Sequence, residues 1–456
     1  MKFLNNLKYF IAACLILSTA ACDDFLDAEL FDAIDAEAAF ETIEDAEKVL
    51  LSVYDAYSSE QSSIIINTAR TADYLKIGQG NRGQGISEYN WNYVPGDAPG
   101  VWGAAYRMIY NANDVLENLD GVEGEEAVKN RIRGEATALR ALAHFDLVRL
   151  YGTSFNENPD ALGVPYLFPP NNPEAEPARE TVRAVYEFIV ADLQEAKALL
   201  SNDNDVNDPS RLSEGAVDAA MARVMLHMGD YAQAETFATA AINNSGVSIA
   251  TSGQYEDVFR DAGNPGVIFE LNILINDFII GNNFYELATG DNFFAPTNDL
   301  LDLYEPGDVR FDVNFSQLAS GEFRVTKYSG KNGEENLADI KVFRIAEMYL
   351  IRAEARANTG NESGALDDLN TVRENRGLSD FSGGGSFLIN EILDERGREL
   401  CFEGQRWLTL KRLGRDVSRM DCTASCLLPS TDTRFLWPIP QGEILANGNM
   451  IQNPGY

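Results

Sequence analysis

The sequence of 456 residues is poor in histidine and in positive charge. It contains two histidines, His144 and His227, and 36 basic residues against 71 acidic ones. Two histidines cannot build a metal cluster, and neither supplies a convincing base for a serine or cysteine triad, so we expect no metal, no cofactor and no nucleophilic catalysis. Both histidines lie among alanine and apolar residues and are expected to be packed.

The acidic excess gives a formal net charge of -35. This charge repels phosphate backbones and anionic headgroups, which argues against a nucleic-acid partner and against electrostatic docking to membranes. It also mildly favours neutral ligands over strongly anionic ones, although local arginines could reverse that at one site. The hydrophobic fraction of 45% is ample for a core, so the chain is predicted to be globular.

Cysteine is scarce as well, with five residues in the chain. Cys401, Cys422 and Cys426, the three that lie far from the N-terminus, do not make a disulfide framework. Cys422 and Cys426 have three residues between them in a turn-rich stretch, and the sequence leaves open whether they pair. Cys401 lies on an apolar helix face and is expected to be a buried, small hydrophobic residue.

The N-terminus has the layout of an export signal over residues 1–21. Lys2 and Lys8 precede an apolar run, Tyr9–Leu17, which is followed by small residues and Cys22. The run is well short of the roughly 20 residues that span a membrane. Cys22 follows two alanines and resembles the cysteine of a bacterial lipobox, with Thr19 where leucine is commonest. We expect lipidation of Cys22, with ordinary cleavage and a free cysteine as the alternative.

Beyond residue 37 the apolar residues recur with helical period. In two segments an alanine follows a glycine by five residues, as Ala234 follows Gly229 and Ala365 follows Gly360. Glycine permits a tight turn and alanine lets two helices approach closely, which is typical of a tetratricopeptide-like helix pair. Two further pairs are looser. The predicted pairs are Val217–Ile242, Phe343–Val372, Arg133–Leu150 with Thr181–Leu200, and Thr42–Tyr57 with Val101–Leu119.

We therefore predict an all-α fold in which about four tetratricopeptide-like helix pairs form a scaffold, because one pair alone cannot bury its apolar face. Residues 58–100, 152–180 and 244–341 interrupt the pairs. We expect these long, irregular insertions to gather on one face and to carry the binding site.

Two of these insertions have the composition of a carbohydrate site. Sugars present C–H faces edged by hydroxyls, so they are bound by aromatic rings with amides, carboxylates or arginines nearby. An alternative is that Tyr89, Trp91 and Tyr93, which alternate in the sequence, pack against the helices as a strand edge. The candidate ligand-binding residues are Asp73, Tyr74, Asn81, Arg82, Tyr89, Trp91, Tyr93, Asn283, Tyr285 and Phe294.

Four glutamates recur every four residues from Glu391 to Glu403. Such like-charge neighbours destabilise an exposed helix, so they need basic partners. We expect structural ion pairs rather than the acid and base of a glycosidase. The expected partners are Arg396, Arg398, Arg406 and Arg412.

Two cofactor templates match only in part. Gly78, Gly80 and Gly83 fit the dinucleotide fingerprint, but no apolar strand precedes them, so we interpret the segment as a loop. Asp203, Asp205, Asn207 and Glu214 fit a calcium loop, yet Asp208 occupies the glycine position. A polar linker with Ser213 as a helix cap explains the same residues.

Several short motifs follow one another along nearly the whole chain. They are Cys22–Asp27, Thr42–Glu47, Ala138–Gly152, Gly163–Tyr166, Glu395–Trp407, Trp437–Pro440 and Gln452–Tyr456. In this order they resemble the SusD/RagB family of outer-membrane glycan-binding lipoproteins of Bacteroidetes.

The resemblance implies a non-catalytic binder of oligo- or polysaccharide, anchored at the cell surface as a lid over a SusC-type TonB-dependent transporter. The helix pairs would face that partner and the loops would bind the glycan. It also implies an N-terminal region over 22–243 and a C-terminal region over 244–456, packed as one unit. A lipid-anchored glycoside hydrolase and a scaffold for protein partners stay open as alternatives.

Overall fold

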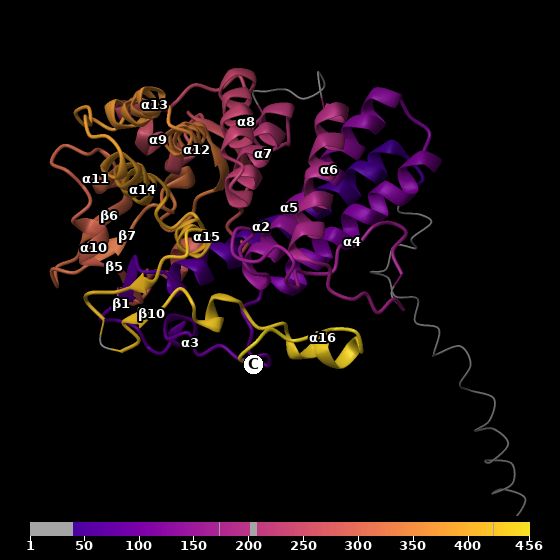
Figure 1. Ribbon diagram of the computed structural model, residues 1–456, viewed down its shortest axis with the longest axis horizontal. Coiled ribbons are helices and arrows are strands. Elements are labelled where there is room, and N and C mark those ends of the chain that lie inside the picture. The colour runs from indigo at the N-terminus through magenta and orange to yellow at the C-terminus, as the bar shows by residue number, and fades with distance from the viewer. Residues whose placement is uncertain (1–39, 173, 201–207, 423) are drawn as a thin grey trace, which may run out of the picture.

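The structure is a computed structural model that describes residues 40–172, 174–200, 208–422 and 424–456 (Figure 1). The predicted signal peptide and Cys22 lie outside the described residues. The calcium-loop candidates Asp203, Asp205 and Asn207 lie outside them too.

Four helix pairs make up the scaffold, which confirms the predicted fold class. Within each pair the two helices contact each other. The pairs containing α2 and α5 lie on one side of the molecule in Figure 1, and those containing α7 and α12 continue along its upper edge. The pairs are α2 (Ile43–Thr71) with α4 (Trp102–Asn118), α5 (Glu126–Tyr151) with α6 (Val182–Leu200), α7 (Glu214–Met228) with α8 (Tyr231–Asn244), and α12 (Ile345–Asn358) with α13 (Glu362–Glu374).

The glycine and alanine signature has its expected physical basis. Gly229 ends α7 with φ 73° and Gly360 follows α12 with φ 86°, both in the left-handed region where glycine carries no steric cost. Ala234 and Ala365, five residues on, are fully buried. Ser213 caps α7 by accepting a hydrogen bond from the amide of Ala216, as predicted.

Helix α2 extends well beyond the predicted end at Tyr57, so part of the expected loop 58–100 is helical. Its last turns are buried on nearly all sides. Thr68 and Thr71 donate their hydroxyl protons to backbone carbonyls of the preceding turn, which satisfies them inside the core. Tertiary burial therefore overrides the weak helical propensity of this threonine- and isoleucine-rich stretch.

Short elements fill the insertions. Five two-stranded antiparallel sheets are found in the described residues: β1 (Leu75–Ile77) with β5 (Phe294–Pro296), β2 (Val267–Leu271) with β8 (Ile340–Arg344), β3 (Tyr285–Glu286) with β4 (Asp291–Asn292), β6 (Phe315–Gln317) with β7 (Phe323–Val325), and β9 (Val417–Ser418) with β10 (Leu427–Leu428). Phe343, predicted to begin a helix, lies in β8.

The remaining helices connect the scaffold to these strands. Helices α3 and α16, together with β10, lie along the edge opposite the upper helix pairs (Figure 1). They are α3 (Ile86–Tyr89), α9 (Tyr255–Arg260), α10 (Asn298–Leu301), α11 (Arg310–Asn314), α14 (Ser386–Leu400), α15 (Arg406–Arg412) and α16 (Gln441–Ala446), with short 3-10 turns η2 (Leu119–Gly121), η3 (Ser252–Gln254), η4 (Ile280–Asn283), η5 (Lys331–Gly333) and η6 (Thr433–Phe435).

One large hydrophobic cluster runs from Ala46 to Met450 and so joins elements from both ends of the chain. His144, His227 and Cys401 are buried, as expected from their apolar surroundings, and Trp102 is buried as well. In the part of the chain that the structure describes, no helix is long and apolar enough to cross a bilayer.

Candidate functional site

The two loops with carbohydrate-site composition meet in space. Strand β1 pairs with β5, so Ile77 lies opposite Phe294. The contact continues past the strands, where the amides of Gly78 and Gly80 donate to the carbonyls of Phe293 and Asn292, each at 2.9 Å. The chain folds loops about 200 residues apart into one surface.

The glycines of the partial dinucleotide fingerprint serve this contact. A Cβ atom at Gly78 or at Gly80 would collide with the backbone of Asn292. Glycine is therefore required for the close approach of two backbones. The short α3, and not a long phosphate-binding helix, follows the turn, which supports the interpretation of the segment as a loop.

Three of the predicted ligand-binding residues lie at this surface. Arg82 is exposed and forms an ion pair with Asp291 of β4. Asn81 donates from its amide to the carbonyl of Phe293 at 2.9 Å. The guanidinium of Arg324 packs against the half-buried ring of Tyr285, with its central carbon 4.5 Å from the ring centroid. We call Asn81, Arg82, Tyr285, Asp291 and Arg324 the turn–hairpin surface.

Asn283, the fourth predicted residue, lies beside this surface. Its side-chain oxygen accepts from the guanidinium of Arg70 at 3.2 Å. Burial lowers the pKa of Arg70 from its usual value. Together these residues offer a ring, an amide, a carboxylate and guanidinium groups, which is the combination that orients a sugar.

Sequence reasoning missed Asp291 and Arg324. Asp291 stands in the second polar and aromatic cluster and could have been found by composition. Arg324 lies in β7 with no local motif, and only the packing of β7 against β5 brings it to Tyr285.

The other six candidates are buried and do not lie at this surface. Trp91 is 2% exposed, and its indole donates to the carbonyl of Thr71 at 2.9 Å. The packed alternative is confirmed, although the segment forms α3 and a tight turn in place of a strand edge. The six buried candidates are Asp73, Tyr74, Tyr89, Trp91, Tyr93 and Phe294.

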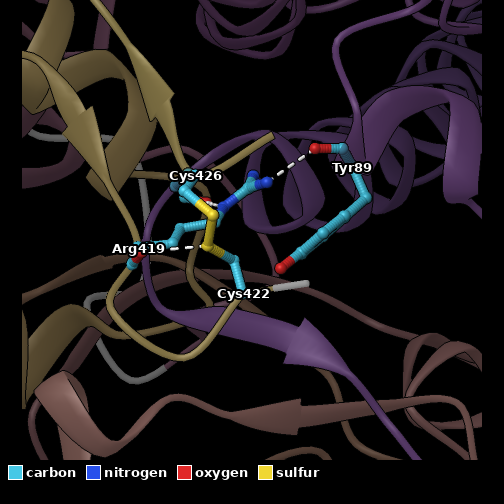
Figure 2. Close-up of a disulfide and its surroundings, with 5 residues drawn as sticks. Tyr89, Arg419, Cys422 and Cys426 are labelled. Atoms are coloured by element: carbon cyan, nitrogen blue, oxygen red, sulfur yellow. Dashed lines mark hydrogen bonds between the residues drawn. A yellow bond between two sulfur atoms is a disulfide. The ribbon is translucent and has the colours of Figure 1, made fainter. Parts of the chain in front are cut away.

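Buried cations explain why these rings turn inward. Arg406 forms a bidentate pair with Asp73 at 2.7 and 2.8 Å and stacks on Tyr74 at 4.3 Å. The guanidinium of Arg419 lies within cation–π distance of the rings of Tyr89 and Trp91, and Figure 2 shows its hydrogen bond to the carbonyl of Tyr89. Neither arginine is near these rings in the sequence, so periodicity could not reveal the packing.

The disulfide that the sequence left open is formed. Cys422 and Cys426 are bonded with a Cα separation of 5.5 Å, and they close the hairpin of β9 and β10 (Figure 2).

The four regularly spaced glutamates all form ion pairs, as expected. Of the predicted partners, Arg398 alone pairs with them. Arg396 and Arg412 pair with Glu354 instead, and Arg406 pairs with Asp73. The basic groups that contact Glu391, Glu395, Glu399 and Glu403 are Arg310, Lys327, Arg344, Arg373, Arg376 and Arg398.

These ion pairs argue against a glycosidase acid among the four glutamates. Burial by itself would raise the pKa of Glu399, but Arg376, Arg344 and Arg310 hold that pKa well below its usual value. Neighbouring cations lower the pKa of Glu395 and Glu403 against burial in the same way. A general acid needs a raised pKa, so these groups are unsuited to donate a proton.

Three other carboxylates converge without forming a vacant metal site. Oxygens of Asp261, Glu270 and Asp339 lie within 4.8 Å of one another. Lys341 donates to Asp261 and Glu270, and Lys331 donates to Asp339. The two ammonium groups supply the positive charge that a bound cation would supply.

A cleft of about 560 Å³ beside α15 has the size of a ligand pocket. Burial lowers the pKa of Lys411 in its wall to about 7, and the ammonium donates to the carbonyls of Arg149 and Gly152. The one aromatic side chain of its lining, Phe435, is buried against Trp407. The cleft therefore offers no ring for a sugar to stack on, in contrast to the turn–hairpin surface.

Comparison with known proteins gives a consistent result over most of the chain. A model described as the SusD family matches residues 294–456, and one described as starch-binding and associating with the outer membrane matches residues 24–226. A SusD-like protein, P2, of Formosa agariphila is 26% identical, with 97% of this chain and 98% of that protein aligned. The starch-binding protein SusD of Bacteroides thetaiotaomicron is 32% identical over 26% of this chain and 22% of its own length.

Solved structures show the same similarity. A putative sugar binding protein from Bacteroides vulgatus superposes with a TM-score of 0.82 at 29% identity, covering 92% of this chain and 99% of that one. A SusD superfamily protein from Bacteroides thetaiotaomicron has a TM-score of 0.82 at 27% identity, covering 91% of this chain and all of that one.

Proposed function

Because this chain belongs to the SusD/RagB family, we propose that it is a cell-surface lipoprotein that binds an oligo- or polysaccharide and delivers it, without catalysis, to a SusC-type TonB-dependent transporter. Family membership is the observation that carries this function. Lipidation at Cys22 would hold the protein in the outer membrane beside its partner.

The turn–hairpin surface is the proposed glycan site. The half-buried ring of Tyr285 would carry the C–H face of a sugar, and Arg324 packed against it keeps the ring in place. Arg82, Asp291 and Asn81 would hydrogen-bond the hydroxyls at the edge of that sugar. Such contacts give modest affinity per site, which avidity along a polymer and among many anchored copies would raise.

Replacing Tyr285 with alanine is expected to weaken binding of the cognate glycan about tenfold, or about 1.4 kcal/mol, because the stacking ring is lost. The unfolding temperature should change little, since the ring is only half-buried. Calorimetric titration of the native protein against a panel of purified polysaccharides identifies the cognate glycan. The same titration of the variant measures the loss of affinity.

Two variants control this experiment. Tyr285→Phe keeps the ring and should retain most of the affinity, while Tyr110→Ala removes an exposed ring on α4 and should have no effect. Unchanged affinity of Tyr285→Ala would remove Tyr285 from the site. Release of reducing ends from the bound glycan would favour the glycosidase alternative, and no sugar affinity at all would favour the protein scaffold.

Replacing Cys22 with alanine is expected to leave export intact and to abolish retention in the outer membrane, because the acyl chains are lost. Cell fractionation with immunoblotting measures the retained share, and Cys14→Ala serves as the matched control. Full retention of the Cys22 variant would contradict the anchor.

A further inference from the structure

Arg419 is a buried cation with no carboxylate partner among the described residues. Its guanidinium donates to four backbone carbonyls instead. The Nε group donates to Ala72 at 2.9 Å, Nη1 to Tyr89 at 2.6 Å, and Nη2 to Arg70 at 2.8 Å and to Thr71 at 3.1 Å. Every donating nitrogen of the group is therefore used.

Three of these carbonyls belong to the C-terminal end of α2, where the last carbonyls have no partner within the helix. A cation at this end also complements the helix dipole. Burial lowers the pKa of Arg419 to about 10, so the group is charged at neutral pH. Its charge is thus stabilised by oriented carbonyls and not by a counter-ion.

The same guanidinium holds the loop that follows α3. Its central carbon lies 3.9 Å from the ring centroid of Tyr89 and 4.4 Å from that of Trp91, within cation–π distance of both rings. Trp91 has φ 54°, a left-handed conformation that a bulky residue adopts only when its surroundings enforce it. The contacts of Trp91 with Arg419 and with the carbonyl of Thr71 hold its backbone in this conformation.

Hydrogen bonds on both sides of the peptide bond between Gln84 and Gly85 connect Arg419 to the turn–hairpin surface. Nη1 binds the carbonyl of Tyr89, and the amide of Tyr89 donates to Gly85 at 3.0 Å. The neighbouring Gln84 accepts from the side chain of Asn81 at 3.0 Å and from the amide of Arg82 at 2.8 Å. The exposed turn is thus tied to the end of α2.

The backbone of Arg419 is held in turn by the disulfide hairpin. Its amide donates to the carbonyl of Cys426 at 2.9 Å, and its carbonyl lies 3.2 Å from the sulfur of Cys422 (Figure 2). The Cys422–Cys426 disulfide therefore lies directly against the backbone of Arg419, the residue that holds the turn.

We infer that Arg419 is a positioning residue for the glycan site, fixed by the Cys422–Cys426 disulfide, and that it orders the turn carrying Asn81 and Arg82. The inference rests on the proposed glycan-binding function. Lysine cannot replace the arginine, because a single ammonium cannot reach four carbonyls and stack between two rings.

Arg419→Lys tests the inference with two readouts. We expect amide hydrogen exchange to accelerate at least tenfold in residues 78–93 while the helix pairs keep their protection. We expect affinity for the cognate glycan to fall about tenfold. Arg415→Lys, at an exposed position four residues earlier, is the matched control and should match the native protein in both readouts.

The double variant Cys422→Ser, Cys426→Ser repeats the test without changing the guanidinium. We expect faster hydrogen exchange in residues 78–93 and weaker glycan binding, both smaller in magnitude than in Arg419→Lys. Native exchange in residues 78–93 of Arg419→Lys would overturn the inference, as would acceleration spread evenly over the chain. If Arg419→Lys does not fold, the serine variant decides by the same criteria. If the native protein binds no glycan on the panel, the proposed function fails, and hydrogen exchange still decides whether Arg419 orders the turn.

Discussion

Replacing Glu399 with glutamine is expected to lower the free energy of unfolding by about 3–5 kcal/mol, the usual cost of removing one partner from buried ion pairs. Glu399 is fully buried in α14. Its carboxylate accepts from Arg344 at 2.5 Å, from Arg376 at 2.8 and 2.9 Å, and from Arg310 at 3.1 Å. Glutamine keeps one acceptor oxygen and turns an amide donor toward a guanidinium, so buried cations are left without compensation.

Urea denaturation followed by circular dichroism measures this loss as a shift of the midpoint at constant slope. Glu374→Gln, an exposed change at the end of α13, is the matched control and should stay within about 0.5 kcal/mol of the native protein. A loss below about 1 kcal/mol in the Glu399 variant would mean that the arginines find other partners, against the network described above.

Acidification below pH 6.5 is expected to destabilise the protein, with a loss from His144 that approaches about 1.4 kcal/mol per pH unit and a contribution from His227 in the same direction. Burial lowers the pKa of His144 to about 3. Its Nδ1 atom lies 2.9 Å from the carbonyl of Arg140, and Nε2 accepts from the amide of Leu167 at 3.2 Å. The neutral ring satisfies both contacts, and protonation of Nε2 would break the second.

Burial also lowers the pKa of His227, and the charges of Arg149, Arg412, Arg223 and Arg396 lower it further. Because both folded pKa values lie below the unfolded value of 6.5, the unfolded state binds more protons as the pH falls. The stabilisation is therefore fully present above pH 6.5, and the part due to His144 is lost as the pH falls from 6.5 to about 3.

Urea unfolding at about pH 7 and about pH 5 measures this dependence. His227→Met removes one titrating group at similar volume and should make the loss of stability between these two pH values smaller. An unchanged loss in this variant would exclude His227 as a cause of the acid sensitivity. Glu395, Glu399 and Glu403, whose folded pKa values are lowered, contribute in the same direction as the pH falls through about 4.5.

The helix pairs were predictable because their signals are local. Ser213 caps α7 by accepting a hydrogen bond from the amide of Ala216, three residues later. Gly229, directly after the last residue of α7, ends the same helix. Capping and periodicity act over a few residues, so they can be recognised without the fold. The end of α2 was not predictable in this way, since packing on nearly all sides and not propensity keeps residues 58–71 helical.

The sequence by itself determined the composition of the two candidate loops, the scaffold of helix pairs and the cysteine spacing that permits a disulfide. Only the tertiary structure decided which candidate side chains reach the surface. Tyr89 faces inward because Arg419, 330 residues away in the chain, binds its carbonyl and stacks on its ring. Tyr285 stays half-exposed against Arg324 of another strand. The direction of a side chain depends on partners that folding brings together, and the sequence near that residue does not encode them.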